Sequence, residues 1–367
     1  MTDPRLKKLA ELLVHYSAKV KPDDFVVVQA EGAATEWIVA VAAEAVRAGA
    51  HVETMVDLPE FKEHLLKEGT EAQLKQELQL QKYLVKHADV WLTAWGTQNT
   101  KANSNISAKR LQLAAKGASS WRKIYSERMG NGALRWCGTQ YPTQADAQEA
   151  EMSLSEYQDF VYGAGLLDTA DPIAAWKDIR HEQERWVDYL NTKKELRIVS
   201  EHTDIRVGIV GRKWINCSGE VNFPDGEIFT SPLENQIDGY ITFSFPGIYM
   251  GKQIEGVYLE VKDGKVITAS AQKGEELLKT LLDTDTGARS FGEVAIGTNY
   301  GIQKFTRNML FDEKIGGTVH MAVGDSLAEA GGKNRSAIHW DMLCDMRESG
   351  KIYADGELFY EKGKFLE

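Results

Sequence analysis

Strand-like and helix-like segments alternate through the first part of this chain, and that order constrains the fold more than any other feature of the sequence. Apolar runs predict strands and helical periodicity predicts helices between them; in chain order the segments cover residues 24–30, 35–48, 51–57, 60–87, 89–95 and 107–115. Because parallel strands need a crossover connection, usually a helix, this order predicts a parallel, doubly wound sheet.

The turn after the first predicted strand bears on whether this sheet binds a nucleotide. Dinucleotide-binding sheets carry three glycines there, which let the backbone approach a pyrophosphate. Here one glycine, Gly32, lies between Glu31 and Glu36, and an acidic residue would repel a pyrophosphate. The sequence therefore argues against a dinucleotide site, and a nucleotide-dependent enzyme is kept only as an alternative.

The segment that follows ends the first predicted domain. Residues 135–148 are polar, and we predict a loop there. Ser153 and Glu156 have the spacing of a capping box, which opens a helix. Another helix starts at Pro172, carries an apolar stripe and ends near residue 191. We therefore predict an N-terminal α/β domain over residues 1–191 and a C-terminal domain over residues 192–367.

Short strand-like runs dominate the second half of the chain. They cover residues 205–210, 240–245 and 258–261, with a tight turn at Asp263-Gly264 and a helix over 274–282. Several short strands with few helices predict an α+β domain with a mixed, largely antiparallel sheet. The predicted fold class is thus α/β plus α+β.

Two histidines and three carboxylates of the C-terminal half stand in short segments that are glycine-flanked or alternate with apolar residues. Imidazole and carboxylate groups together form the ligand set of two-metal hydrolases. The candidate metal ligands are Glu227, Glu293, His320, His339 and Asp341.

The spacing of these residues supports a shared site. His339 and Asp341 are two residues apart, so on a strand their side chains point to the same face. His320 lies between Val319 and Met321, which is again the pattern of a strand with one polar and one apolar face. The same spacing is also typical of ordinary strands whose polar side chains are half-exposed or hydrogen-bonded.

The composition narrows the range of partners. The net charge is -11, and no basic cluster with interleaved aromatic residues occurs, which argues against a nucleic-acid partner. No apolar run approaches the ~20 residues that cross a membrane, and the N-terminal residues lack a signal-peptide pattern. The three cysteines are widely spaced and form no CxxC pair, which favours a reducing, cytoplasmic setting.

Several stretches of the chain resemble the aminopeptidase T family of dinuclear metallo-aminopeptidases. They are NFPDGEIFTSP from Asn222, GEVAIGTNYG from Gly292, NMLFDEKIGGTVHMAVG from Asn308, GGKNRSAIHWD from Gly331, and residues 135–157. The resemblance spans nearly the whole chain in the family's order. It implies a two-domain, homodimeric exopeptidase with an enclosed chamber, which removes N-terminal residues from peptides.

The same resemblance implies a metal centre. Two divalent ions per chain are expected, and mixed nitrogen and oxygen ligands suit Zn, Co or Mn. Carried over by motif, the ligands are the five candidates named above, with Glu293 as the bridging, catalytic carboxylate. The sequence does not single out a general base.

The chain departs from the family at Leu327. The family has a tyrosine seven residues after its first ligand histidine, and here Leu327 and Ala328 replace the Tyr and the Pro that follows it. A phenol can ligate an ion or stabilise an oxyanion, and leucine can do neither. A catalytically weakened or inactive metal-binding homologue is therefore an alternative, unless another phenol, such as that of Tyr300, takes the role.

Overall fold

The computed structural model describes residues 3–249 and 251–367, and the chain divides into two compact units. Unit 1 comprises Met1–Ile173 and Gly219–Pro224, and unit 2 comprises Ala174–Ser218 and Asp225–Glu367. This division differs from the predicted domains 1–191 and 192–367. Helix α9 (Pro172–Asn191) falls almost wholly in unit 2, because its apolar side chains pack into the core of that unit.

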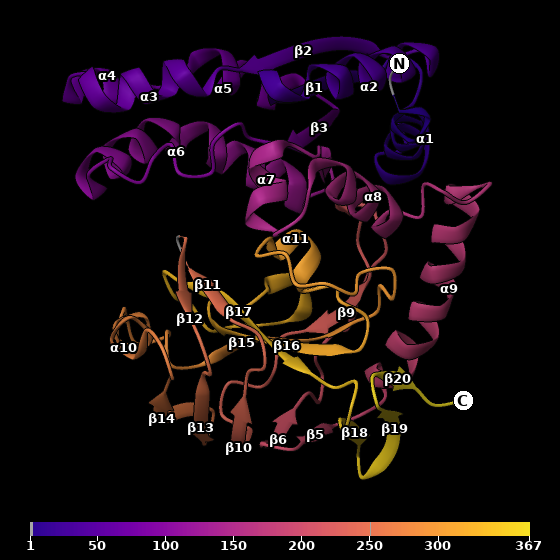
Figure 1. The fold of residues 1–367 in the computed structure, drawn as a ribbon, viewed down its shortest axis with the longest axis vertical. Helices are drawn as coiled ribbons and strands as arrows, with labels where there is room; N and C mark the ends of the chain where they lie inside the picture. Colours follow the sequence, from indigo (N-terminus) through magenta and orange to yellow (C-terminus); the bar gives the residue numbers. More distant parts are fainter. Residues whose placement is uncertain (1–2, 250) are drawn as a thin grey trace. The chain divides into compact units, whose positions relative to one another are not determined.

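Unit 1 is built on a five-stranded parallel sheet of order β2-β1-β3-β4-β8, which confirms the doubly wound prediction. In Figure 1 the part of this unit that precedes residue 174 runs from indigo to magenta. The strands are β1 (Phe25–Glu31), β2 (His51–Asp57), β3 (Val90–Trp95), β4 (Arg135–Gln140) and β8 (Asn222–Phe223).

The helices of unit 1 follow the predicted pattern with two refinements. The region predicted as mostly helical before β3 contains three separate helices, and the helix after β3 is much longer than predicted. The capping box of Ser153 and Glu156 is confirmed at the start of α8. The α-helices are α1 (Pro4–Leu12), α2 (Thr35–Arg47), α3 (Pro59–Glu68), α4 (Glu71–Leu74), α5 (Gln79–His87), α6 (Ala108–Gly130), α7 (Gln144–Glu149) and α8 (Leu154–Ala164).

The predicted loop over residues 135–148 is wrong, because this segment forms strand β4 and helix α7. β4 pairs with β3 along its whole length. The buried Gln140 of β4 donates from Nε2 to Asp146 Oδ2 at 2.9 Å, and the hydroxyl of Thr143, the N-cap of α7, accepts from the Asp146 backbone. The polar composition of this segment therefore led to a loop prediction for a strand that lies inside the sheet.

Unit 2 contains an eight-stranded antiparallel sheet of order β14-β13-β10-β6-β5-β18-β19-β20. The predicted turn at Asp263-Gly264 connects β13 to β14, and both residues have positive φ, as a tight hairpin requires. The strands are β5 (Glu195–Ser200), β6 (Thr203–Gly208), β10 (Ile237–Thr242), β13 (Tyr258–Lys262), β14 (Lys265–Ser270), β18 (Lys351–Ala354), β19 (Glu357–Glu361) and β20 (Lys364–Phe365).

A second antiparallel sheet of unit 2 has five strands in the order β17-β16-β15-β9-β7. They are β7 (Ile215–Cys217), β9 (Glu227–Thr230), β15 (Phe291–Gly297), β16 (Thr318–Gly324) and β17 (His339–Asp345). The remaining elements of this unit are the short pair β11 (Gly247–Tyr249) and β12 (Lys252–Ile254), α10 (Glu275–Leu282) and α11 (Met309–Asp312).

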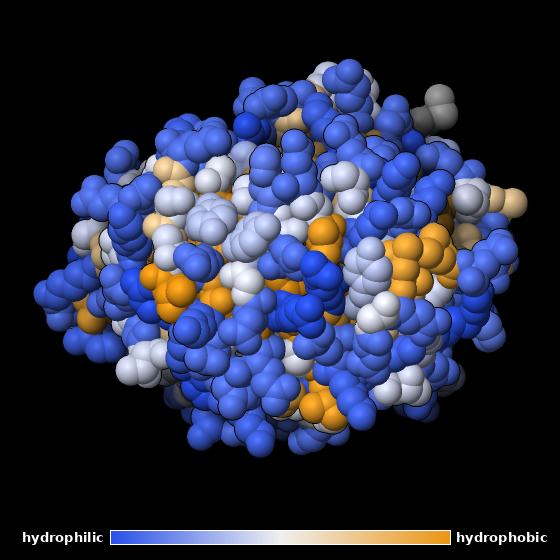
Figure 2. All heavy atoms as spheres, turned by 90° about the horizontal axis from the view of Figure 1, so that it is seen from below, coloured by the Kyte–Doolittle hydropathy of each residue, from blue (hydrophilic) through white to orange (hydrophobic). Residues whose placement is uncertain are grey.

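Both sheets of unit 2 contribute side chains to one hydrophobic core. Ile237 and Ile241 of β10 are buried, while Asp238 and Tyr240 between them are exposed. This alternation is typical of an antiparallel sheet with one face on the core and one in water. Figure 2, seen from the side where Figure 1 draws the eight-stranded sheet, shows a mostly hydrophilic surface with small separate hydrophobic patches.

One face of the five-stranded sheet packs against the same core. Ile228, Val294, Met321 and Trp340 lie in that core, so the residues that alternate with them point to the opposite face. None of the helices within the described ranges 3–249 and 251–367 is long and apolar enough to cross a membrane.

Candidate metal centre

All five candidate ligands lie on the face of the five-stranded sheet that points away from the core. In the register, Glu227 is opposite Gly297, and His320 is opposite Ala295. Glu293 and Asp341 are both opposite Ala322, and His339 is opposite Gly324. Small residues thus separate the polar side chains on adjacent strands and leave room between them.

The ligand atoms form two groups that share Glu293. Glu227, Glu293 and His320 make one group and Glu293, His339 and Asp341 the other, each with atoms within 4.8 Å of one another. His320 Nε2 lies 3.6 Å from Glu293 Oε1, and His339 Nε2 lies 3.1 Å from Glu293 Oε2. Each oxygen of Glu293 therefore faces a different histidine, as a carboxylate shared by two ions requires.

The remaining distances complete each group. His320 Nε2 is 3.3 Å from Glu227 Oε2, and His339 Nε2 is 3.5 Å from Asp341 Oδ1. The first group is buried, whereas the side chain of His339 keeps 31% of its surface exposed. The second group is thus the one nearer to solvent.

Burial and proximity strongly perturb the titration of these residues. Burial raises the pKa of Glu227 to about 8 although Lys314 lies close by. Burial also disfavours the charged Glu293, but the bonds with His320 and His339 outweigh it and hold its pKa at about 2. Burial opposes charging of the histidines, yet the surrounding carboxylates raise the pKa of His320 to about 9 and of His339 to about 11. The ligand face of the five-stranded sheet therefore favours positively charged groups.

The unpaired atoms of this face fit a divalent metal ion. Among the residues that the structure describes, Glu227 Oε2 and Asp341 Oδ1 are buried acceptors that make no hydrogen bond. Their imidazole neighbours are Nε2 of His320 at 3.3 Å and Nε2 of His339 at 3.5 Å. Buried polar atoms are normally satisfied, and leaving them unpaired is costly. His339 Nδ1 is 2.8 Å from the Asp325 carbonyl, so Nδ1 donates, and once the ring has lost its second proton the lone pair of Nε2 is available to a metal. Nitrogen and oxygen donors of this kind suit Zn, Co or Mn.

The sequence reading missed a charged group that borders these ligands. Lys314, just after α11, is fully buried; its Nζ is 3.5 Å from Glu227 Oε1 and 4.0 Å from Asp225 Oδ1, and it contacts Glu313 Oε1. Burial raises the pKa of Glu313 although Lys314 opposes this, and Glu313 borders the ligands because it shares the Lys314 ammonium with Glu227. Three successive charged residues between Phe311 and Ile315 were the available signal.

Leu327 lies beside the centre as an apolar side chain. It packs with Phe229, Ala295 and Ala330. The Ser231 hydroxyl accepts from its backbone N–H at 3.0 Å. Tyr300, the other phenol considered, donates its hydroxyl to the Gly363 carbonyl at 2.9 Å. The structure therefore does not bring the phenol of Tyr300 to the position expected of the family's tyrosine.

Comparisons with known proteins connect this geometry to a family. Aminopeptidase 2 of Geobacillus stearothermophilus is 32% identical over 241 residues, which are 60% of this chain and 58% of that protein. Aminopeptidase T of Thermus aquaticus is 31% identical over 51% of this chain and 52% of its own length, so the chain spans little more than half of these relatives. Aminopeptidase AmpS of Bacillus subtilis is 26% identical over 96% of both chains.

Two solved structures share the fold. AmpT from Thermus thermophilus superposes with a TM-score of 0.87 at 24% identity over 99% of both chains. A 2,5-dihydroxypyridine dioxygenase from Pseudomonas putida reaches a TM-score of 0.60 at 15% identity, over 98% of this chain and 96% of its own. Because a dioxygenase shares the fold, the fold alone does not determine the reaction. Residues 2–365 match the thermophilic metalloprotease (M29) family, and the chain therefore belongs to that family.

Proposed function

We propose that this protein is a metallo-aminopeptidase that removes N-terminal residues from peptides with two divalent metal ions. Membership of a metalloprotease family implies a metal cofactor and peptide substrates. The observation that carries the proposal is the position of Glu293, which belongs to both groups of ligand atoms. The proposed ligands are Glu227, Glu293, His320, His339 and Asp341, with Glu293 as the shared, catalytic carboxylate.

The charge of the site supports two ions rather than one. Five carboxylates and one ammonium meet there, so the formal charge is -4 when both histidines are neutral. Two divalent ions balance that charge, and buried charge is stable only when it is balanced. The carboxylates counted are those of Asp225, Glu227, Glu293, Glu313 and Asp341.

The residues of the chain supply the remaining parts of a peptide hydrolysis. A bound pair of ions would lower the pKa of a water nucleophile and polarise the scissile carbonyl. Glu313 is our candidate to take a proton from the attacking water, because its carboxylate contacts the Lys314 ammonium that also lies 3.5 Å from Glu227 Oε1. It can then deliver that proton to the leaving amine nitrogen. The free α-amine of the substrate, a group that internal peptide bonds lack, could also be held by one of the ions.

Hydrolysis of aminoacyl-p-nitroanilides tests the proposal. We expect release of nitroaniline that stops after chelation and returns when Zn, Co or Mn is added back. The N-acetylated form of the same substrate is the matched control, because it lacks the free amine and should not be cleaved. A fully metal-loaded protein that cleaves neither substrate nor any short peptide would support the inactive homologue instead.

Metal binding should release protons and strengthen as the pH rises. In the metal-free protein the pKa values of about 9 for His320 and about 11 for His339 keep both imidazoles protonated at neutral pH. A histidine must lose its proton to bind a metal, so loading near pH 7 should release about two protons or more. Calorimetric titration in buffers of different ionisation enthalpy measures this number. Loading without proton release near pH 7 would contradict the protonated state.

The protein is also expected to be a homodimer, as the resemblance implies, and to be cytoplasmic, as its unpaired cysteines indicate. All three cysteines are free, in keeping with a reducing compartment. Light scattering should give twice the mass of one chain. If dimerisation encloses the centre, short peptides should be hydrolysed and folded proteins should not. A monomer with full activity on short peptides would rule out a dimer as a requirement.

A further inference from the structure

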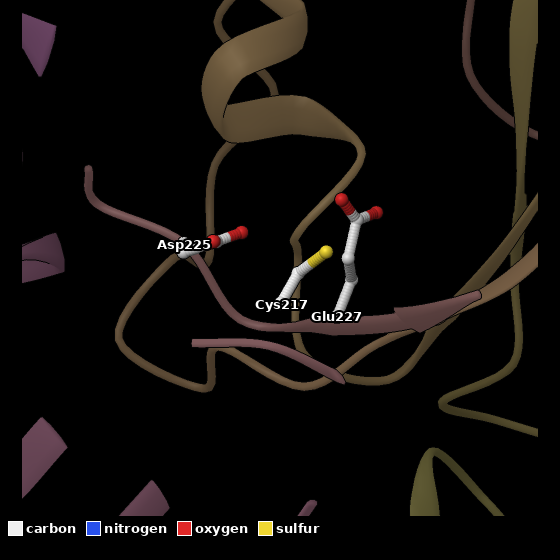
Figure 3. Close-up of side chains that lie close together, drawn as sticks. All are labelled: Cys217, Asp225 and Glu227. Atoms are coloured by element: carbon white, nitrogen blue, oxygen red, sulfur yellow. The ribbon is translucent and has the colours of Figure 1, made fainter. Parts of the chain in front are cut away.

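A third group of metal-ligating atoms borders the proposed centre. Cys217, Asp225 and Glu227 bring one sulfur and two carboxylates within 4.8 Å of one another, and Figure 3 shows all three side chains directed into the same space. Cys217 is opposite Glu227 in the ladder between β7 and β9, so it lies on the face of the ligands. Sulfur with carboxylates is a donor set that suits a thiophilic divalent ion.

The local backbone fixes this third group. Gly226, between the two carboxylates, has φ of 122°, and a Cβ there would lie 2.7 Å from Asn299 Cβ. Only glycine adopts this conformation readily and fits against Asn299. The carboxylates of Asp225 and Glu227 are therefore held beside each other by the turn.

A cation from the chain itself already contacts this group. The Lys314 ammonium is 3.5 Å from Glu227 Oε1 and 4.0 Å from Asp225 Oδ1, and its side chain is fully buried. A buried lysine is stable only beside compensating carboxylates, which Glu313 completes. Because Lys314 takes Oε1 of Glu227, Oε2 is the oxygen left facing His320.

We propose that Lys314 is a built-in cation that positions Glu227 and closes the group of Cys217, Asp225 and Glu227 to metal ions. Lys314 thereby limits the centre to two ions and keeps the thiol from capturing a third, thiophilic one. The limit of two ions rests on the proposed function, whereas the closure of the thiol group does not. Lys314 is a positioning residue in this account, because it acts through Glu227.

Cadmium binding tests the proposal without any measurement of activity. Purified full-length protein is stripped with a chelator, loaded with Cd²⁺ and analysed for bound metal and for the ultraviolet charge-transfer band of thiolate bound to cadmium. We expect two ions and no thiolate band for the natural chain. Lys314→Met, which keeps length and removes charge, should bind a third ion and show the band.

Two further variants show whether the charge-transfer band comes from the thiol of Cys217. Cys217→Ser in the Lys314→Met background should lose the band, since the thiols of Cys137 and Cys344 lie outside this group. Cys217→Ser alone should match the natural chain in metal content. A thiolate band in the natural chain that disappears in Cys217→Ser would overturn the proposal even if Lys314→Met did not fold. Folded Lys314→Met with two ions and no band would overturn it equally.

The outcomes separate this inference from the proposed function. A natural chain that binds two ions, shows no band and cleaves no peptide would contradict the peptidase and leave the role of Lys314 intact. An active peptidase with a Cys217 thiolate band would contradict the role of Lys314 alone.

Discussion

Glu293→Gln is expected to remove at least one metal ion and to lower peptide turnover by about a thousandfold or more, which corresponds to the several kcal/mol that metal catalysis supplies. Glu293 faces His320 with one oxygen and His339 with the other. Two divalent ions about 3.5–4 Å apart repel each other strongly unless a negative group lies between them. Glutamine keeps the size of the side chain and removes only that charge.

Elemental analysis alongside an aminoacyl-p-nitroanilide assay measures both effects. Glu260→Gln is a matched control, because Glu260 lies on β13 of the other sheet and accepts a hydrogen bond from Thr268. That variant should keep the metal content and activity of the natural chain. If Glu293→Gln retained two ions, Glu293 would not be the shared ligand.

Much of the fold could be predicted from local patterns. The strands β1, β2 and β3 are apolar runs, and their alternation with helices was enough to predict the parallel sheet of unit 1. β4 was missed because its Thr139 and Gln140 are polar, although both are buried and Gln140 donates to Asp146. The start of unit 2 was predicted after α9 rather than before it, since only the packing of α9 shows that this helix belongs to the core of unit 2.

The candidate site shows a similar division. The alternation around His320 and His339 predicted the strands β16 and β17, and the structure confirms both. Glu227 and Glu293 were candidates because each follows a glycine in a short segment, and only the resemblance gave Glu293 its bridging role. The charged run at residues 312–314 marks Lys314 as unusual, but its burial depends on contacts with Asp225 and Glu227, far away in the sequence.

Leu327→Tyr is expected to raise peptide turnover while metal content stays the same. The loss of one oxyanion donor commonly costs ~10²–10³ in turnover, so restoring one should recover up to about that factor. The side chain at this position packs beside Ala295, which is opposite His320 in the ladder, so the substituted ring would lie next to the centre. The five proposed ligands are untouched, and metal affinity should therefore change little.

The packing of Leu327 decides how this variant must be controlled. A larger ring also changes contacts with Phe229 and Ala330, and that alone could alter activity. Leu327→Phe introduces the same ring without the hydroxyl, so the difference between the Tyr and Phe variants isolates the hydrogen-bond donor. Equal turnover in the two variants would show that the phenol has no role here.

Tyr300→Phe completes the comparison, because Tyr300 was the other phenol considered. Its hydroxyl donates to the Gly363 carbonyl and the residue is 45% exposed, so removal of the hydroxyl should leave kcat almost unchanged. A large loss of kcat in Tyr300→Phe, with no gain in Leu327→Tyr, would mean that Tyr300 changes partner when substrate binds. We expect the opposite pattern, with a gain of turnover in Leu327→Tyr and no loss in Tyr300→Phe. The hydrogen-bond donor that this chain lacks would then be at residue 327, and Tyr300 would only hold its own loop to Gly363.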